Sequence, residues 1–169
     1  FGRIGKNLIK KCLAFNMNVK VYDPFVEEKI INDMGGKKVD NFDDALKTLD
    51  FLSLHMPLNK NTKDLINLNK MKTMKNTSVI INTARGGIIN ETDLNQAVNE
   101  KIILGAGLDV FSTEPINLNS PLLKNKRIIL SPHTAALTNE CKIRMGKETA
   151  QNIIDFFEKN INKNMLVNL

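Results

Sequence analysis

Short apolar runs alternate with helix-like segments along the whole sequence, and this alternation restricts the possible folds more than any other feature. Each run is short, mostly apolar and bounded by turn residues, which is typical of a buried strand. The runs fall at residues 19–22, 38–39, 51–54, 78–81, 105–108 and 128–130. Strands that are apolar throughout must be covered on both faces, so the pattern predicts an α/β domain with a parallel sheet.

Six helices are predicted between and after these strands. They fall at residues 4–15, 27–34, 42–48, 68–74, 91–100 and about 139–159. Asn41, Asn90 and Thr138 are predicted to be N-caps of three of these helices. Asp44 and Asp93 lie where a capping box has its acidic residue. The last helix carries an apolar stripe at helical spacing, formed by Ile143, Ala150, Ile153, Ile154 and Phe157.

The composition argues against several classes of protein. No apolar run approaches the ~18 residues of a membrane span, so we expect no membrane contact. The net charge is +6, but all but four of the 24 basic residues are lysines scattered along the chain, and aromatic residues are only 5%. This pattern does not favour nucleic-acid binding. Cys12 and Cys141 lack metal-ligand spacing, so we expect two buried thiols, no metal site and a reducing cytoplasm.

The chain opens with a glycine-containing segment that runs directly into an apolar helix. Gly2 and Gly5 match the second and third glycines of the G-x-G-x-x-G motif, which brings backbone N–H groups close to a pyrophosphate. We therefore expect Gly2, Arg3, Ile4 and Gly5 to contact a dinucleotide. Two glycines alone would fit a plain turn about as well.

Asp23 gives the glycine segment more weight. It ends the next predicted strand, 18 residues after Gly5, where a carboxylate can accept hydrogen bonds from the adenosine ribose. Since a carboxylate there also repels a 2′-phosphate, we expect NAD rather than NADP. The alternative is that Asp23, directly before Pro24, caps a helix.

Polar residues follow four of the predicted strands at the point where each strand ends. The loops concerned are residues 55–58, 82–87, 109–115 and 131–136. Because the carboxyl ends of parallel strands lie at one edge of a sheet, these loops are expected to form a single ligand site.

Three motifs in these loops identify a family resemblance. They are Thr83-Ala84-Arg85-Gly86-Gly87, Leu108-Asp109-Val110-Phe111 with Glu114-Pro115, and Pro132-His133-Thr134-Ala135-Ala136. In order and spacing the sequence resembles the NAD-binding domain of the NAD-dependent D-isomer-specific 2-hydroxyacid dehydrogenases. The resemblance implies a Rossmann-type, doubly wound parallel sheet, NAD as the cofactor, a small 2-hydroxy or 2-oxo acid as the substrate, and a homodimer formed through this domain.

The resemblance also implies roles for individual residues. The equivalents of Arg85, Glu114 and His133 are catalytic in the family, and the equivalent of Asp109 contacts the nicotinamide carboxamide. The chemistry agrees, because a histidine near its neutral pKa exchanges a proton, a carboxylate orients the ring, and an arginine binds a substrate carboxylate. Taken singly, each could instead serve an ordinary loop role.

Further positions are expected to line the cofactor. They are Pro57, Thr62, Thr83, Ala84, Arg85, His133, Ala135 and Ala136. The sequence leaves open whether His55 and Thr62 contact the cofactor or serve the structure. Met71 and Met74, at helical spacing, are expected in the core.

The sequence departs from the family at its beginning, where the first strand, the first glycine and the substrate domain are absent. We expect one domain over residues 1–169, with about residues 160–169 leading toward the substrate domain. The missing central strand predicts a gap, or distorted pairing, between residues 19–22 and 51–54. We also expect the isolated chain to be inactive and poorly folded.

The expected substrate is D-3-phosphoglycerate, with glyoxylate or hydroxypyruvate as the alternative. A different class is a corepressor that senses NAD(H), but such relatives carry a Trp shortly after the histidine. This chain has Ala136-Leu137 there and no Trp. Formate dehydrogenase resembles the chain less, because it has Gln at the position of Glu114.

Overall fold

The structure is a computed structural model that describes residues 1–162 and residue 166. It divides into two compact units, Phe1–His133 and Thr134–Leu169, which are described separately. Most of the segment expected to lead toward a further domain, residues 160–169, lies outside the described residues.

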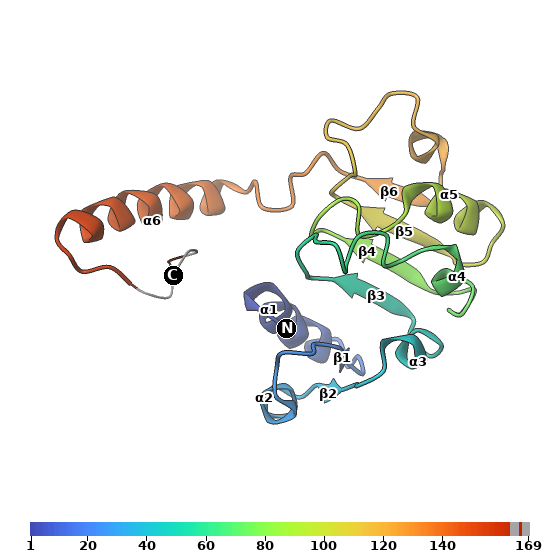
Figure 1. Cartoon of the computed structure of the whole chain (residues 1–169), viewed down its shortest axis with the longest axis horizontal. Coiled ribbons are helices and arrows are strands. Elements are labelled where there is room, and N and C mark those ends of the chain that lie inside the picture. Colours follow the sequence, from blue (N-terminus) through green and yellow to red (C-terminus); the bar gives the residue numbers. More distant parts are fainter. Residues whose placement is uncertain (163–165, 167–169) are drawn as a thin grey trace. The chain divides into compact units, whose positions relative to one another are not determined.

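Parallel strands form the centre of the first unit (Figure 1). A four-stranded sheet has the order β3-β4-β5-β6, with strands Phe51–Leu54, Val79–Asn82, Gly105–Leu108 and Ile128–Leu130. A separate pair contains β1 (Lys20–Val21) and β2 (Lys37–Lys38). All pairings are parallel, which confirms the predicted α/β class. Three strands have the predicted bounds, and the other three differ by one or two residues.

The predicted gap in the sheet is present. Within the described residues β1 pairs with β2 alone, and β3 pairs with β4 alone, so no hydrogen-bonded ladder joins the two sheets. Val21 in β1 packs instead with Ile9 and Ile31 in a small cluster of its own. The two sheets therefore have separate hydrophobic cores.

The helices agree with the sequence prediction in number and place, apart from one short element. The α-helices are α1 (Arg3–Ala14), α2 (Glu28–Asp33), α3 (Phe42–Leu46), α4 (Leu68–Met71), α5 (Glu91–Asn99) and α6 (Asn139–Phe157). A 3₁₀-helix, η1 (Pro121–Lys124), was not predicted, because a single turn has too little periodicity to stand out. Among the described residues no helix is both long and apolar enough to cross a bilayer.

The predicted caps are confirmed. The side chains of Asn41, Asn90 and Thr138 each accept a hydrogen bond from the backbone N–H three residues further on. Asp93 does not complete a capping box, because its Oδ2 accepts from the N–H of Leu68, at 2.9 Å. Asp44 instead pairs with Lys47. These contacts fix the ends of α3, α5 and α6, while Asp93 ties α5 to the start of α4.

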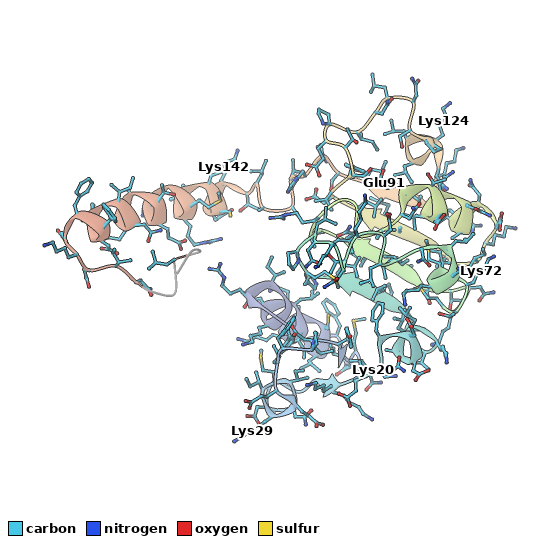
Figure 2. All side chains as sticks on the ribbon, in the orientation of Figure 1. Lys20, Lys29, Lys72, Glu91, Lys124 and Lys142 are labelled. Carbon is cyan, nitrogen blue, oxygen red and sulfur yellow. The ribbon has the colours of Figure 1, made fainter. Side chains whose placement is uncertain are left out.

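The main core lies against the four-stranded sheet. Leu54, Ile80 and Leu108 from the strands pack with buried residues of α4 and α5. Met71 and Met74 belong to this core, as expected. The labelled lysines in Figure 2 lie on separate elements, in agreement with the scattered distribution in the sequence.

Two expectations about burial need correction. Cys12 and Cys141 are half-buried rather than buried. The apolar residues of α6 have the predicted spacing, yet no residue of this helix is buried. Among the residues of the second unit that the structure describes, α6 is the one regular element, and no other helix or strand there covers the stripe.

The loops that follow β4 and β5 approach each other more closely than any side chain would permit. A Cβ atom on Gly86 would lie 1.8 Å from the carbonyl oxygen of Phe111 and 2.6 Å from the nitrogen of Ser112. On the partner loop, the N–H of Ser112 also donates to the Glu91 carboxylate, at 2.5 Å. Gly86 is therefore required by backbone packing, and it fixes the spacing of two loops at the sheet edge.

Substitution of Gly86 tests this close approach. Gly86→Ala is expected to lower the free energy of unfolding by about 1–3 kcal/mol or more, because two backbone segments must separate. Gly107→Ala is the control, since a Cβ atom there meets nothing within 4 Å, and its change should stay within about 0.5 kcal/mol. Urea unfolding of the full-length protein gives both values. Equal effects from the two substitutions would show that the loop contact is not the cause.

Candidate active site

The carboxyl ends of β3 to β6 place polar residues at one edge of the sheet. His55 follows β3, Asn82 ends β4, Asp109 follows β5 and Ser131 follows β6. Since all four strands are parallel and paired in this order, the four positions lie on neighbouring strand ends. Within the first unit, the structure thus brings together the strand ends from which the predicted site loops start.

His133 and Glu114 form an ion pair or hydrogen-bonded pair at this edge. The ring Nδ1 of His133 lies 2.7 Å from Glu114 Oε2, and Glu114 Oε1 accepts from the N–H of Phe111 at 3.0 Å. These contacts, the histidine first among them, hold the pKa of the Glu114 carboxyl below its ordinary value. An ionised carboxylate only accepts, so the proton between the two groups sits on Nδ1, and Nε2 is the ring atom left to meet a substrate.

The pair is accessible and its backbone is constrained. The side chains of His133 and Glu114 are 51% and 36% exposed, as a group that exchanges a proton with a substrate must be. The φ angle of His133 is +56°, in the left-handed region that non-glycine residues seldom adopt. Its N–H donates to the carbonyl of Ser131 at 3.1 Å. Such strain persists only where the surrounding structure holds it, and it is frequent at functional sites.

Asp109 lies deeper in the same edge. It is 3% exposed, and Ser131 Oγ donates to its Oδ1 at 2.6 Å. Its backbone N–H donates to the carbonyl of Asn82 at 3.0 Å. Ser131 was not predicted as a site residue. The signal in the sequence was the position of this hydroxyl residue directly after β6, because β6 neighbours β5, which Asp109 follows.

Arg85 lies on a loop that Asn82 shapes. The buried amide of Asn82 donates to the carbonyl of Arg85 at 2.9 Å and accepts from the N–H of Ala84 at 3.0 Å. The Arg85 side chain itself is exposed, with Nη1 donating to the Ala84 carbonyl at 2.6 Å. Sequence reasoning missed Asn82, whose signal was a polar side chain at the buried end of a strand.

His55 has a different environment from His133. Its Nε2 shares a 2.8 Å hydrogen bond with Ser53 Oγ on β3. Within the part of the chain that the structure describes, the His55 ring forms no ion pair with a carboxylate. Burial, above all, lowers the pKa of the His55 imidazole. A ring that is neutral and bonded to a serine is less suited to proton transfer near pH 7 than one paired with a carboxylate.

Thr62 serves its own loop. Its Oγ1 donates to the carbonyl of Pro57 and accepts from the N–H of Asn59, both at 2.8 Å. These bonds close the turn that follows β3, which gives Thr62 a structural role whether or not it also contacts a ligand.

The first turn of α1 suits an anion. Its N-cap is Gly2, which has no side chain to bond the free N–H groups, and no acidic residue lies in the turn. A Cβ atom on Gly2 would meet nothing within 4 Å, so the backbone is open to close approach. A helix N-terminus with free N–H groups and positive dipole attracts a phosphate, so this segment fits the pyrophosphate of a dinucleotide.

Asp23 lies two residues beyond β1. Its Oδ1 accepts from the N–H of Phe25 at 2.9 Å. The carboxyl group of Asp23 is ionised near pH 7, as aspartates ordinarily are. The N-cap of α2 is Glu27. The alternative that Asp23 caps this helix is therefore wrong.

The other predicted cofactor positions are mainly at the surface. Arg3, Ile4, Pro57, Thr83, Ala135 and Ala136 are exposed, and Ala84 is half-buried. Ala135 and Ala136 belong to the second unit and are described only within it. Their contact with a cofactor remains a prediction.

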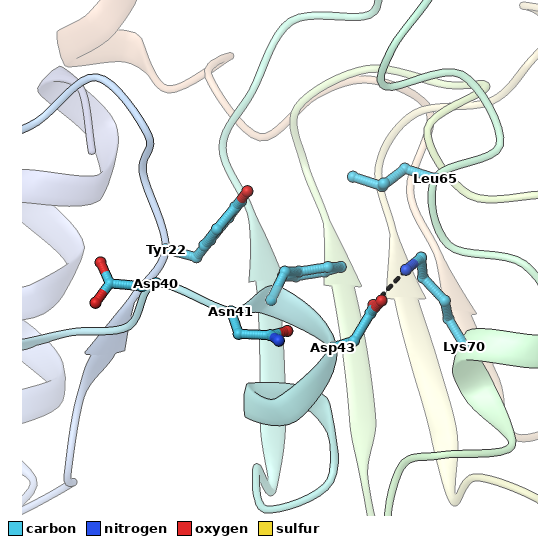
Figure 3. Close-up of a pocket in the computed structure, with 7 residues that line it drawn as sticks. Tyr22, Asp40, Asn41, Asp43, Leu65 and Lys70 are labelled. Atoms are coloured by element: carbon cyan, nitrogen blue, oxygen red, sulfur yellow. Dashed lines mark hydrogen bonds and ion pairs between the residues drawn. The ribbon is translucent and has the colours of Figure 1, made fainter.

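A cavity of about 350 Å³ lies elsewhere in the first unit (Figure 3). Its lining consists of Tyr22, Asp40, Asn41, Phe42, Asp43, Leu65 and Lys70. Lys70 pairs with Asp43 and lies over the ring of Phe42, and Tyr22 contacts the same ring. No predicted site residue lines this cavity, and its charged groups already include a matched pair.

Comparison with known proteins identifies the family of this chain. The family model of the D-isomer specific 2-hydroxyacid dehydrogenase, NAD binding domain, matches residues 1–135. The chain is 38% identical to a D-3-phosphoglycerate dehydrogenase of Archaeoglobus fulgidus, over 91% of this chain and 29% of that protein. It is 36% identical to a glyoxylate reductase of Korarchaeum cryptofilum, over 98% of this chain and 49% of the relative. The chain thus spans half or less of these relatives.

The fold comparison gives the same result. A crystal structure of D-lactate dehydrogenase from Aquifex aeolicus, complexed with NAD and lactic acid, has a TM-score of 0.81 at 30% identity. The match covers 94% of this chain and 52% of that one. The fold is Rossmann-like and the cofactor of the family is NAD. The chain belongs to the D-isomer specific 2-hydroxyacid dehydrogenases, as their NAD-binding domain.

Proposed function

We propose that the protein containing this chain is an oxidoreductase that transfers a hydride between NAD(H) and a small D-2-hydroxy acid or its 2-oxo acid. The observation that carries the proposal is the 2.7 Å contact between His133 and Glu114 at the edge where the strand-end loops meet. Family membership supports it, because relatives that share this domain bear the names of such enzymes.

His133 is the proposed acid and base. Glu114 holds Nδ1 in its protonated form and stabilises the imidazolium, so Nε2 can give a proton to the carbonyl oxygen during reduction or take one from the hydroxyl during oxidation. Arg85 presents a planar fork of donors that suits a carboxylate, and its charge polarises the neighbouring carbonyl. When bound, NAD supplies or accepts the hydride.

The remaining polar groups are proposed to hold the cofactor. The N–H groups at the start of α1 bind the pyrophosphate, with Gly2 and Gly5 leaving room for it. The ionised Asp23 accepts from the adenosine ribose, and Asp109 contacts the nicotinamide carboxamide. His55 and Thr62, which follow β3, are proposed to lie next to the bound cofactor.

D-3-phosphoglycerate is the proposed substrate, and glyoxylate or hydroxypyruvate is the alternative. Relatives named for phosphoglycerate and for glyoxylate match this domain at nearly equal identity, so the domain itself does not separate them. Most groups that would distinguish a phosphate-bearing substrate from a smaller one are proposed to lie in another domain. A panel of these 2-oxo acids, assayed with the full-length protein and NADH, identifies the substrate.

Two substitutions test the catalytic assignment in the same assay. His133→Gln should lose most of the turnover and still bind NADH, because the proton donor is removed and the cofactor groups remain. Arg85→Ala should lower kcat/KM, because it removes a charge-assisted contact to the substrate carboxylate. The expected loss of transition-state stabilisation is on the order of 3 kcal/mol.

His55→Gln is the matched control for His133→Gln. It changes a histidine on the same sheet edge that has no carboxylate partner in the described contacts, and it should retain most of the turnover. Near-normal turnover in His133→Gln, together with its loss in His55→Gln, would transfer the proton step to His55.

Cofactor preference tests the role of Asp23. NADH should bind clearly better than NADPH, because the ionised carboxylate accepts from ribose hydroxyls and repels a 2′-phosphate. Asp23→Ala should weaken the binding of NADH and reduce the difference in affinity between NADH and NADPH. Titration of the full-length protein with each cofactor measures both affinities. Asp40→Ala is a control at an exposed acid after β2. An unchanged preference in Asp23→Ala would contradict the assignment.

The protein is also proposed to be a cytoplasmic homodimer. α6 exposes Ile143, Ile153, Ile154 and Phe157, an apolar surface of the kind that a second copy can cover. Sedimentation equilibrium of the full-length protein should give twice the mass of one chain, and Ile153→Lys should lower that mass. A monomer at micromolar concentration would contradict the proposal. The cytoplasmic location rests on the cysteine usage, and cell fractionation tests it.

A further inference from the structure

Ser131 is hydrogen-bonded to the carboxylate of Asp109 and to the backbone of His133, the two residues proposed to act at the nicotinamide end of the site. It follows β6 directly, and its N–H donates to the carbonyl of Leu108 at 2.9 Å, which extends the strand pairing by one bond. Its Oγ donates to Asp109 Oδ1 at 2.6 Å. Its carbonyl oxygen accepts from the N–H of His133 at 3.1 Å. One residue therefore connects the buried carboxylate to the histidine.

The contact with Asp109 has the geometry of a strong hydrogen bond. A length of 2.6 Å is in the range of about 2.5–2.7 Å typical of a hydroxyl that donates to a carboxylate. Asp109 is almost fully buried, and a buried carboxylate needs hydrogen-bond donors. The N–H of Asp109 is already bonded to Asn82, so its backbone is fixed. The remaining freedom is rotation of the carboxylate, which the Ser131 hydroxyl restricts.

The contact with His133 acts on a strained residue. At φ +56° the backbone of His133 needs support from its surroundings, and the hydrogen bond to Ser131 supplies part of it. Ser131 itself is anchored on one side by the sheet and on the other by Asp109. A shift of Ser131 would therefore move the carboxylate and the histidine together.

We propose that Ser131 is a positioning residue that sets the orientation of the Asp109 carboxylate toward the nicotinamide carboxamide of NAD. This inference rests on the proposed function, in which Asp109 is the group that contacts the carboxamide. Ser131 acts through Asp109 and does not touch the reacting atoms.

A matched pair of substitutions isolates the hydroxyl. Ser131→Thr keeps it and Ser131→Val removes it, while the two side chains have nearly the same shape. In the full-length protein Ser131→Val should weaken NADH binding about tenfold, and Ser131→Thr should stay within about threefold of the original protein. The enhancement of NADH fluorescence on binding measures both, and urea unfolding confirms that both variants are folded.

Binding of ADP-ribose separates positioning from general damage. ADP-ribose has the adenosine, the pyrophosphate and both ribose rings but lacks the nicotinamide. Ser131→Val should bind it as the original protein does, measured by calorimetry, because only the nicotinamide end depends on Asp109. Equal weakening of ADP-ribose and NADH would overturn the proposal, since Ser131 would then support the whole site.

Asp109→Asn distinguishes failure of the inference from failure of the proposed function. If Asp109→Asn weakens NADH but Ser131→Val does not, the inference fails and the role of Asp109 stands. If Asp109→Asn leaves NADH binding unchanged, the proposed contact with the carboxamide fails, and the inference fails with it. In the Asp109→Asn background, Ser131→Val should add less than about threefold, because the two residues act on one contact. Additive effects would overturn the proposal.

Discussion

Parallel pairing of β3 to β6 is the constraint on which the rest of the first unit depends. Each of these strands contributes apolar side chains to the main core, and most of the polar residues proposed for the site follow the strand ends. Because every pairing is parallel, those ends lie at one edge. The loops there cannot move independently, since the backbone of the β4 loop at Gly86 lies directly against that of the β5 loop at Phe111. The sheet thereby fixes the distances within the site.

Polar residues at this edge are connected to one another by hydrogen bonds that do not depend on a bound ligand. Asn82 bonds both ends of the Arg85 turn, and its own carbonyl accepts from the N–H of Asp109. Ser131 joins Asp109 to the His133 backbone, and Glu114 orients the His133 ring. A second residue thus holds the backbone of Arg85, the carboxylate of Asp109 and the ring of His133. Such preorganisation is what catalytic groups require, because chemistry is sensitive to displacements of about 1 Å.

Features that depend on nearby residues in the chain could be predicted, and features that depend on the register between strands could not. The caps at Asn41 and Asn90 are local, and the sequence placed them correctly. The pair of His133 and Glu114 was predicted through a motif, because spacing alone does not place a ring against a carboxylate 19 residues away. The hydrogen bond from Ser131 to Asp109 joins the ends of two different strands, and no motif in the sequence predicts it. The half-burial of Cys12 depends likewise on packing against other elements.

The two histidines show why the position of a residue at the sheet edge does not determine its chemistry. Both follow strands of the same sheet, and the residue type alone does not show which of them is the better candidate for a proton donor. Burial lowers the pKa of His55, and its partner is the neutral hydroxyl of Ser53, so that ring is kept uncharged. The ring of His133 contacts the Glu114 carboxylate and is half exposed to solvent. The difference comes from Glu114, whose own carboxylate is fixed by the N–H of Phe111, in the segment that packs against Gly86. The packing of two backbone segments thus supports the carboxylate contact that distinguishes His133 from His55.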